Sequence, residues 1–176
     1  MYKFYAADGQ ENIVYGAARP GYSDEQVASW IQFVQEQGIQ KVCCLLADAQ
    51  LSHYRSNLLE IYHLRFGKDK VCWAPIEDFH LASEETLTQI ILPFLNKAYQ
   101  ESEKVVVHCG GGIGRTGHVL AAWLIYSRKI SNTEAIAAVK KTGRNPYEAV
   151  ITAPVYGKNP WKVTRELNTL LDKCRY

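Results

Sequence analysis

The chain has 176 residues, with 20 basic and 18 acidic side chains and a formal net charge of +2. This length and the 47% share of hydrophobic residues predict a single domain over residues 1–176 with a full apolar core. The nearly balanced charge gives no argument for nucleic-acid or membrane binding, and no apolar run reaches the roughly 18 residues that a membrane span needs.

The expected strands cover residues 1–6, 13–15, 41–46, 70–74 and 104–108. The expected helices cover residues 23–37, 52–66, 83–100, 116–128 and 131–141, and a last helix begins near residue 160. Ser23 with Gln26, and Ser131 with Glu134, are spaced as capping boxes, and Pro93 is expected to kink or divide its helix. Strands that alternate with helices predict an α/β fold, with a central, largely parallel sheet of about four to five strands flanked by helices.

Cysteine usage favours a reducing, cytoplasmic location. The five cysteines are Cys43, Cys44, Cys72, Cys109 and Cys174. Their number is odd and no C-x-x-C pair occurs, so neither a disulfide framework nor a structural zinc site is expected. The opening residues MYKFYAADGQ show no basic region followed by an apolar one, so we expect no signal peptide and a cytoplasmic protein.

The stretch KVVVHCGGGIGRTG, residues 104–117, joins an apolar strand to a helix through a turn with four glycines. Ligands of parallel sheets bind beyond the carboxyl ends of the strands, where this turn is expected to lie. Such a turn points backbone N–H groups into one concavity, the helix dipole adds positive charge, and an arginine fork matches two phosphate oxygens. The predicted phosphate-binding residues are Gly110, Gly111, Gly112, Ile113, Gly114 and Arg115.

Cys109 lies at the entrance to this predicted cradle, where the same positive field stabilises a thiolate. An activated thiolate beside a bound phosphate is the arrangement needed for nucleophilic phosphoryl transfer. The string His108-Cys109-x5-Arg115-Thr116-Gly117 resembles the signature of the cysteine-dependent protein tyrosine and dual-specificity phosphatases, particularly their small microbial members. The alternative is a glycine-rich strand–helix turn with a buried cysteine, which leaves Arg115 and the fourth glycine unexplained.

The resemblance implies a protein tyrosine phosphatase-like fold and catalysis that needs no metal or cofactor. It makes Cys109 the nucleophile and Arg115 the phosphate ligand. It also implies that Thr116 donates a hydrogen bond to the sulfur and that His108 orients the loop and tunes the thiolate. Helix capping by Thr116 and an ordinary structural hydrogen bond of His108 are the alternative interpretations.

The family also supplies a general acid from a loop upstream of the cysteine. Here the strand at residues 70–74 leads into Pro75-Ile76-Glu77-Asp78, which resembles that loop and places Asp78 in the acid position. The leaving oxygen needs a proton, which a protonated carboxyl group can give. Glu77 and the more distant Asp48 are the alternative acids, and a solvated acidic turn is the alternative without chemistry.

Two segments match the family less closely. Arg19-Pro20-Gly21-Tyr22 resembles a segment near the entrance to the active site, so Arg19 either contacts substrate or belongs to a solvated turn. Where relatives often carry Arg-Pro-Gly-Ala-Val and then a glutamine that positions the hydrolytic water, this chain has no glutamine after Lys141. Either Asp78 positions that water alone, or another side chain such as Asn145 helps.

The expected function is therefore a protein phosphatase that hydrolyses phosphotyrosine in a phosphorylated protein or peptide, with phosphoserine and phosphothreonine as additional candidate substrates. The alternatives are a phosphatase for a non-protein phosphate such as a phosphoinositide, and a module that only binds phosphorylated ligands. The absence of lysine between Cys109 and Arg115 argues against the first alternative, and the presence of Cys109, Arg115 and Asp78 argues against the second. Neither nucleic acid nor a membrane is expected as a partner.

A reversible disulfide with Cys43 or Cys44 is a further hypothesis, because an accessible thiolate oxidises readily. Only one of the two neighbours can face Cys109, since side chains alternate along a strand. Cys44 is nearer the carboxyl end of its strand and is the preferred partner. The alternative is that both are ordinary core residues.

Overall fold

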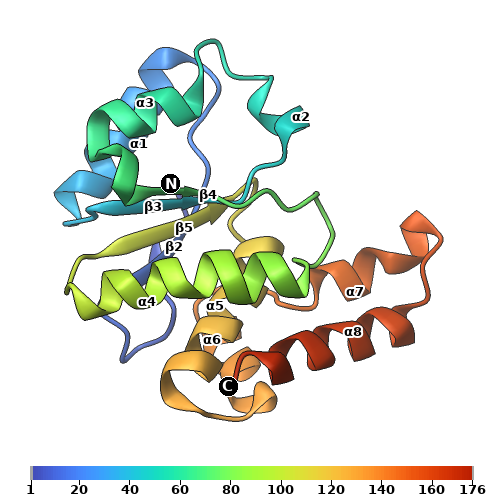
Figure 1. Ribbon diagram of the computed structural model, residues 1–176. Coiled ribbons are helices and arrows are strands. Elements are labelled where there is room, and N and C mark those ends of the chain that lie inside the picture. Colours follow the sequence, from blue (N-terminus) through green and yellow to red (C-terminus); the bar gives the residue numbers. More distant parts are fainter. Residues whose placement is uncertain (1, 176) are drawn as a thin grey trace.

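The computed structural model describes residues 2–175, and its centre is a five-stranded sheet in the order β1-β2-β5-β3-β4 (Figure 1). The strands are β1 (Tyr5–Ala6), β2 (Val14–Ala18), β3 (Lys41–Cys44), β4 (Val71–Trp73) and β5 (Val105–Cys109). β2, β5, β3 and β4 are parallel, and β1 is antiparallel to β2. The predicted α/β class is confirmed, and the strand that carries Cys109 is the middle strand of the sheet.

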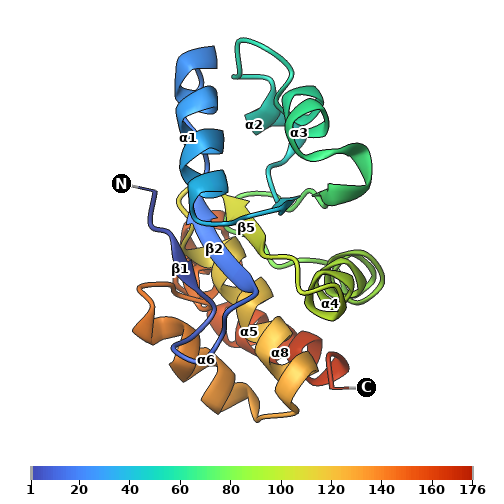
Figure 2. The same ribbon diagram turned by 90° about the vertical axis from the view of Figure 1, so that its left-hand side faces the viewer.

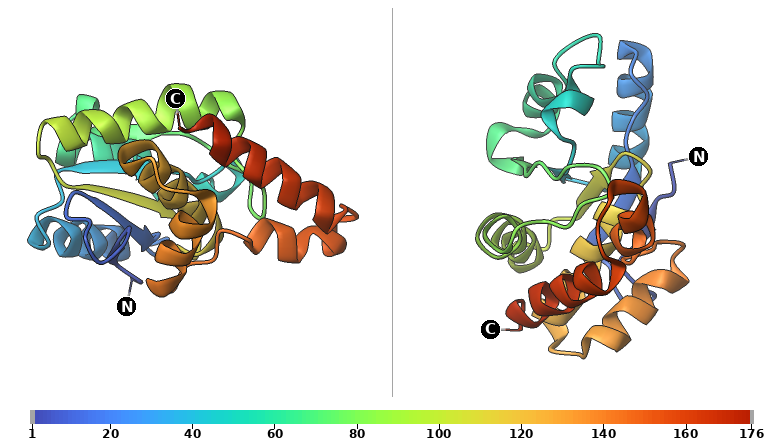
Figure 3. Two further views of the ribbon diagram at one scale, coloured as in Figure 1. Left: turned by 90° about the horizontal axis from the view of Figure 1, so that it is seen from below. Right: turned by 90° about the vertical axis from the view of Figure 1, so that its right-hand side faces the viewer.

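Helices cover both faces of the sheet, as the side view and the view from below show (Figures 2 and 3). One face carries α1 (Asp24–Glu36) and α3 (Leu58–Phe66), with the short α2 (Asp48–Leu51) between them in the chain. The other face carries α4 (Leu92–Gln100), α5 (Gly114–Arg128), α6 (Asn132–Lys141) and α8 (Pro160–Lys173). Each face has its own buried cluster, with Trp30 and Tyr62 in the first and Leu95 and Trp123 in the second.

Both predicted capping boxes are confirmed. The Ser23 hydroxyl accepts a hydrogen bond from the Gln26 backbone N–H, and the Gln26 side chain accepts one from the Ser23 backbone, so α1 begins at Asp24. Ser131 and Glu134 make the same reciprocal pair at the start of α6. Each box satisfies two of the backbone donors that a helix start leaves free, which is why local sequence located these two helix starts well.

Four predicted elements differ from the structure by more than two residues or in type. The strand expected over residues 1–6 covers only Tyr5–Ala6 within the described part of the chain. The helix expected over residues 52–66 begins only at Leu58, because the Asn57 side chain accepts from two backbone N–H groups and caps the helix there. The strand expected over residues 13–15 extends to Ala18, where its pairing with Cys109 ends. The kink expected at Pro93 takes the form of a π-helical segment, η2 (Thr86–Ile91), directly before α4. A wider turn at this point is consistent with a proline that cannot donate to the regular helix ladder.

Two short elements precede α8 and were not predicted. They are α7 (Glu148–Thr152) and the 3-10 turn η3 (Ala153–Tyr156). Elsewhere in the chain, another 3-10 turn, η1 (Lys68–Lys70), precedes β4. α7 packs against both α5 and α8, with Ala149, Ala153 and Val163 buried between them. Its position brings the segment after Lys141 back to the start of α5.

Candidate active site

The glycine-rich turn follows β5 at the carboxyl edge of the sheet, as predicted. Its backbone passes so close to β2 that a Cβ on Gly112 would lie 2.6 Å from the backbone of Ala17 and Ala18. Gly112 also has a φ of +69°, which disfavours any residue with a side chain. A hydrogen bond of 2.9 Å from the Arg19 N–H to the Cys109 carbonyl fixes the start of the turn. Gly112 is therefore required by the path of the backbone.

Cys109 ends β5, and its thiol lies at the N-terminus of α5. Its side chain is almost fully buried, with 2% exposure, and the Thr116 hydroxyl donates a hydrogen bond of 3.1 Å to Sγ. α5 begins at Gly114, so its free N–H groups and the positive end of its dipole are directed to the same turn. This environment can stabilise negative charge both on the sulfur and on a bound anion.

Arg115 lies in the first turn of α5 and is 2% exposed. Its Nη1 donates to Gln50 Oε1 at 2.6 Å and to the Ile76 carbonyl at 2.9 Å, and its Nη2 is 3.0 Å from Asp78 Oδ1. The Ile76 carbonyl and the side-chain amide of Gln50 are uncharged, so they orient the guanidinium without neutralising it. The arginine is therefore held in place as a cation at the predicted phosphate site.

Asp78 comes from the loop after β4 and reaches Arg115, although 37 positions separate the two residues. Its side chain is 46% exposed, and Oδ1 also accepts a hydrogen bond from the Phe79 N–H. Phe79 has a φ of +58°, a left-handed conformation that turns the chain sharply after the carboxylate. The structure thus brings Asp78, Arg115 and the Cys109 turn together, while Glu77 is exposed and forms no side-chain hydrogen bond or ion pair with the turn.

His108 lies next to Cys109 in the chain, but its ring packs on the α1–α3 face. It contacts the Trp30 ring at a centroid distance of 5.2 Å, and its Nε2 is 3.1 Å from the Tyr62 hydroxyl. Burial lowers the pKa of His108 to about 3, so the ring is neutral at physiological pH. The ring itself therefore anchors the end of β5, and its link to the Cys109 turn runs through the backbone.

Two site residues carried no sequence signal and were missed. Gln50 belongs to α2 and reaches Arg115 only through the fold. His118 lies one turn into α5, where it accepts at Nε2 from the Ala82 N–H (3.1 Å) and faces the Gly114 carbonyl at Nδ1 (3.3 Å). Burial lowers the pKa of His118 to about 4, which fits a neutral ring that accepts at one nitrogen and donates at the other. His118 thus ties the segment after Asp78 to the start of α5.

The segment after α6 adds a buried cation and a carboxylate. Arg144 is 3% exposed, donates to Thr142 Oγ1 and to the Lys3 carbonyl, and fills the space beside Gly16. Burial lowers the pKa of this guanidinium to about 10. Glu148, the first residue of α7, lies over Gly114. The sequence predicts a role in this segment for Asn145 but gives no signal for Glu148.

Arg19 packs against its own turn, and Cys43 and Cys44 pack in the clusters on opposite faces of the sheet. The Arg19 guanidinium lies 3.7 Å from the centre of the Tyr22 ring and donates to the Pro20 carbonyl. Cys44 packs with the cluster on the α1–α3 face, and burial raises its pKa to about 12, whereas Cys43 packs in the same cluster as Cys109. A redox role for either cysteine stays a prediction, and its chemical basis at Cys44 is weakened because the protonated thiol is a poor nucleophile.

A cavity of about 780 Å³ adjoins the Asp78 loop but does not include Cys109. It is bounded by residues 79–84 on one side and by α8 on the other, and Phe79 stacks on Tyr156 at 5.7 Å. Within residues 2–175 no three His, Cys, Asp or Glu side chains are grouped so that they could hold a metal ion. None of the helices in this described part of the chain is both long and apolar enough to cross a membrane.

The fold and the Cys109–Arg115 turn define the class of cysteine-dependent phosphatases. The protein-family model described as "Polymorphic toxin system, DSP-PTPase phosphatase" matches residues 15–129. The chain therefore belongs to this family, and it is a phosphatase of the dual-specificity and protein tyrosine phosphatase superfamily.

Individual relatives agree with this assignment. The chain is 30% identical to dual specificity protein phosphatase 5 of Rattus norvegicus over 69 residues, which are 39% of this chain but only 18% of the rat protein. It is 33% identical to cyclin-dependent kinase inhibitor 3 of Sus scrofa over 129 residues, which cover 70% of this chain and 59% of that protein. The chain thus spans less than two thirds of the length of both relatives.

Solved structures show the same fold. The active form of Tk-PTP superposes with a TM-score of 0.69 at 27% identity, covering 95% of this chain and 97% of that one. Kinase associated phosphatase, in a form whose catalytic site cysteine is replaced by serine, gives a TM-score of 0.69 at 24% identity and covers 83% of this chain. PTPMT1 in complex with PI(5)P, at 16% identity and a TM-score of 0.66, is similar in fold alone.

Proposed function

We propose that this phosphatase hydrolyses phosphotyrosine in a protein or peptide, with phosphoserine and phosphothreonine as further substrates, through a cysteinyl-phosphate intermediate. The observation that carries the proposal is the convergence of the Cys109 thiol, the buried Arg115 guanidinium and the Asp78 carboxyl group at one helix N-terminus. These three groups are a nucleophile, a phosphate ligand and an acid that come from separate elements of the fold.

In the first step the Cys109 thiolate attacks phosphorus while Arg115 and the backbone N–H groups of the turn bind the non-bridging oxygens. The sulfur–phosphorus bond forms and the phosphorus–oxygen bond to the substrate breaks. Protonated Asp78 gives its proton to the leaving oxygen. In the second step water cleaves the sulfur–phosphorus bond, and the Thr116 hydroxyl stabilises the departing thiolate.

Asp78 and Arg115 form an ion pair of 3.0 Å. A phosphate dianion offers Arg115 two oxygens in the geometry of its fork, so the substrate can replace the carboxylate as a partner. Asp78 is the exposed member of the pair and lies on a loop, so it is the group that can move. The released carboxyl group then lies beside the leaving oxygen, where the proton is needed.

The composition of the turn supports a substrate with a single phosphate. The turn between Cys109 and Arg115 holds four glycines and Ile113, with no lysine to bind the additional phosphates of a phosphoinositide. A lipid or other non-protein phosphate is the alternative substrate, and the same three catalytic groups would serve it.

A turnover panel tests the proposal. Phosphotyrosine, phosphoserine and phosphothreonine peptides and phosphatidylinositol phosphates are compared at equal concentration, with reductant and a metal chelator present. We expect the highest kcat/KM for a phosphotyrosine peptide and no loss of activity with the chelator. A higher kcat/KM for a phosphoinositide would overturn the substrate assignment, and activity restored only by added metal would overturn the cysteine mechanism.

A further inference from the structure

A second carboxylate lies directly on the phosphate-binding turn. Glu148 is the first residue of α7, and its half-buried side chain crosses the α-carbon of Gly114. A Cβ on Gly114 would lie 1.8 Å from Glu148 Oε2 and 2.6 Å from the Glu148 Cβ. The fourth glycine of the turn is therefore explained by the Glu148 side chain, which occupies the space that a residue at position 114 would need.

The charges around Glu148 are those of the site itself. Burial raises the pKa of Glu148 most, and the Asp78 carboxylate raises it further. The pKa is lowered by Arg115, by the nearby backbone N–H of Gly114 and by Lys3, but these effects do not cancel the increase. A carboxylate whose affinity for protons is raised in this way is a better base than one in water.

No other side chain of this segment takes the place of the missing glutamine. Asn145 was the candidate, but its Oδ1 accepts from the Tyr147 N–H at 3.2 Å and its own N–H donates to the Ile113 carbonyl at 3.3 Å. Asn145 thus holds the bend that leads into α7. The residues that stand roughly in the place of the glutamine, such as Val155 and Tyr156, are exposed and lie beyond α7.

We propose that Glu148 accepts the proton of the water that hydrolyses the cysteinyl phosphate. This inference rests on the proposed function. The water oxygen bonds to phosphorus as the phosphorus–sulfur bond breaks, and the electron pair of that bond returns to Sγ as a thiolate. One proton of the water moves to the Glu148 carboxylate, which later releases it to solvent, and inorganic phosphate leaves. Asp78 has by then given its proton to the first product, so its negative charge further favours proton uptake by Glu148.

Rapid-mixing kinetics with p-nitrophenyl phosphate separate the two steps, because nitrophenolate leaves in the first step only. For Glu148→Gln and Glu148→Ala we expect a burst of about one equivalent of nitrophenolate at the wild-type rate, followed by steady-state turnover slowed roughly 100-fold or more, as for loss of a general base. Acid-quenched protein should carry a phosphoryl group on Cys109, detected by mass spectrometry. Wild-type steady-state turnover in Glu148→Gln, or a burst slowed as much as the turnover, would overturn the proposal.

Matched controls separate this inference from the proposed function. Glu166→Ala removes an exposed carboxylate on the neighbouring α8, whose ion-pair partner is Lys162 at 4.0 Å, and should leave both phases unchanged. Thermal stabilisation by inorganic phosphate, equal in wild type and Glu148→Gln, shows that the cradle is intact. If wild-type protein forms no phosphoryl-Cys109 at all, the proposed function fails. If wild type forms it and both Glu148 variants turn over normally, only the role of Glu148 fails.

Discussion

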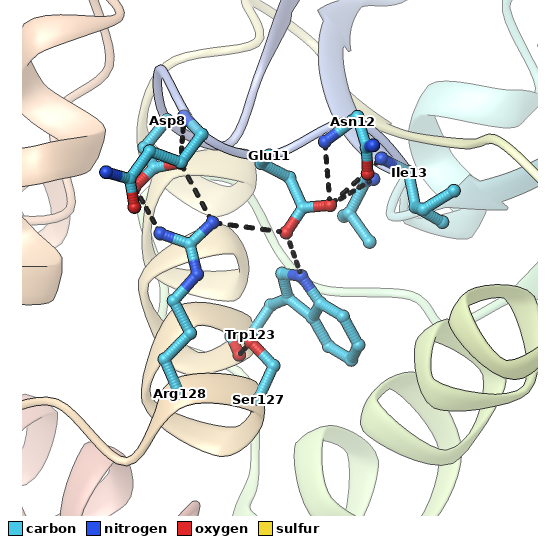
Figure 4. A network of polar contacts seen from close by, with 9 residues as sticks. Asp8, Glu11, Asn12, Ile13, Trp123, Ser127 and Arg128 are labelled. Carbon is cyan, nitrogen blue, oxygen red and sulfur yellow. Dashed lines mark hydrogen bonds and ion pairs between the residues drawn. The ribbon is translucent and has the colours of Figure 1, made fainter. Parts of the chain in front are cut away.

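The arginines at the two ends of α5 differ in how they are paired with carboxylates. At the C-terminal end, Arg128 donates to both carboxylate oxygens of Asp8, at 2.5 and 3.0 Å, and lies 3.6 Å from Glu11 (Figure 4). Glu11 also accepts from the Trp123 indole and from three backbone N–H groups. At the N-terminal end, buried Arg115 is paired with Asp78, a carboxylate that is 46% exposed and lies on a loop.

The difference follows from the helix dipole. A cation at a helix C-terminus is stabilised by the dipole, so Arg128 satisfies both the helix and its carboxylate partners. A cation in the first turn is opposed by the dipole, so Arg115 is costly for stability unless an anion binds beside it. The C-terminal end therefore stabilises the fold. At the N-terminal end the cation is paired with an exposed carboxylate, which phosphate replaces in the proposed function.

Replacing the nucleophile gives the largest expected effect. It should remove the chemistry at the N-terminal end of α5 and leave the C-terminal end unchanged. Cys109→Ser should lose turnover by on the order of 10⁴-fold or more, because the serine hydroxyl does not ionise at working pH. The fold and the binding of inorganic phosphate should survive, since Arg115 and the backbone donors remain. Steady-state assays with a phosphotyrosine peptide and thermal melts with phosphate measure both. Retained activity in this variant would contradict the cysteine mechanism.

The acid is expected to contribute less than the nucleophile. Asp78→Asn should slow kcat roughly 100- to 10,000-fold for a phosphotyrosine peptide, since the leaving oxygen is no longer protonated. The loss should shrink for aryl phosphates with good leaving groups, which a series of substituted phenyl phosphates measures. An equal loss for every leaving group would assign the acid elsewhere, and Glu77→Gln is the matched control from the same loop.

At the other end of α5, Arg128→Met should reduce stability and leave the chemistry intact. It strands Asp8 and the almost fully buried Glu11, so we expect a loss of about 2–3 kcal/mol in the free energy of unfolding. The melting temperature should then fall by about 5–10 °C. Arg55→Met is the matched control, because Arg55 is 74% exposed in its pair with Asp24 and should matter by less than about 1 kcal/mol. The prediction is contradicted if kcat/KM of Arg128→Met is also reduced at a temperature where the variant is fully folded, because the C-terminal end would then affect the chemistry.

The dependence of stability on pH should also distinguish the two ends of α5. His108 and His118 have folded pKa values of about 3 and 4, lowered by burial from 6.5. The folded protein thus binds fewer protons than the unfolded chain, so stability falls as pH drops below 6.5, by up to about 1.4 kcal/mol per pH unit for each ring. Urea unfolding between pH 7 and pH 5 should show a shallower slope for His118→Gln than for wild type.

Asp8 provides the complementary measurement for the C-terminal end. Burial raises the pKa of Asp8, but the hydrogen bonds from Arg128 and the Gln10 backbone outweigh it and leave a lowered pKa. A carboxyl group with a lowered folded pKa stabilises the protein above its unfolded pKa, near 3.8, and loses this effect as pH falls through the folded pKa. Asp8→Asn should therefore be less stable than wild type at pH 7, and this difference should shrink only below about pH 4. A difference that already shrinks between pH 7 and pH 5 would contradict this assignment.

The sequence alone determined the class of fold, the family and the position of the glycine-rich turn after β5. These features depend on local patterns: apolar strands between amphipathic helices, capping boxes at Ser23 and Ser131, and a turn whose glycines, cysteine and arginine lie within seven residues. Asp78 was also predicted, but only because the segment after its strand resembles a known loop. Each of these signals is contained in a short stretch of chain, so it survives without three-dimensional information.

Only the tertiary structure decided which distant residues complete the site. Gln50 and Glu148 have no distinctive neighbours in the sequence, and they reach the turn because α2 follows a strand that ends at the same edge of the sheet and because α7 folds back onto α5. His118 lies in α5 itself, but its partner, the Ala82 N–H, is 36 residues away in the chain. The face on which His108 packs depends on the pleating of β5 and on contacts with Trp30 of α1 and Tyr62 of α3. The network at the other end of α5 likewise joins distant parts of the chain, since 120 residues separate Asp8 from Arg128. Such contacts are set by packing and chain topology, which no local pattern encodes.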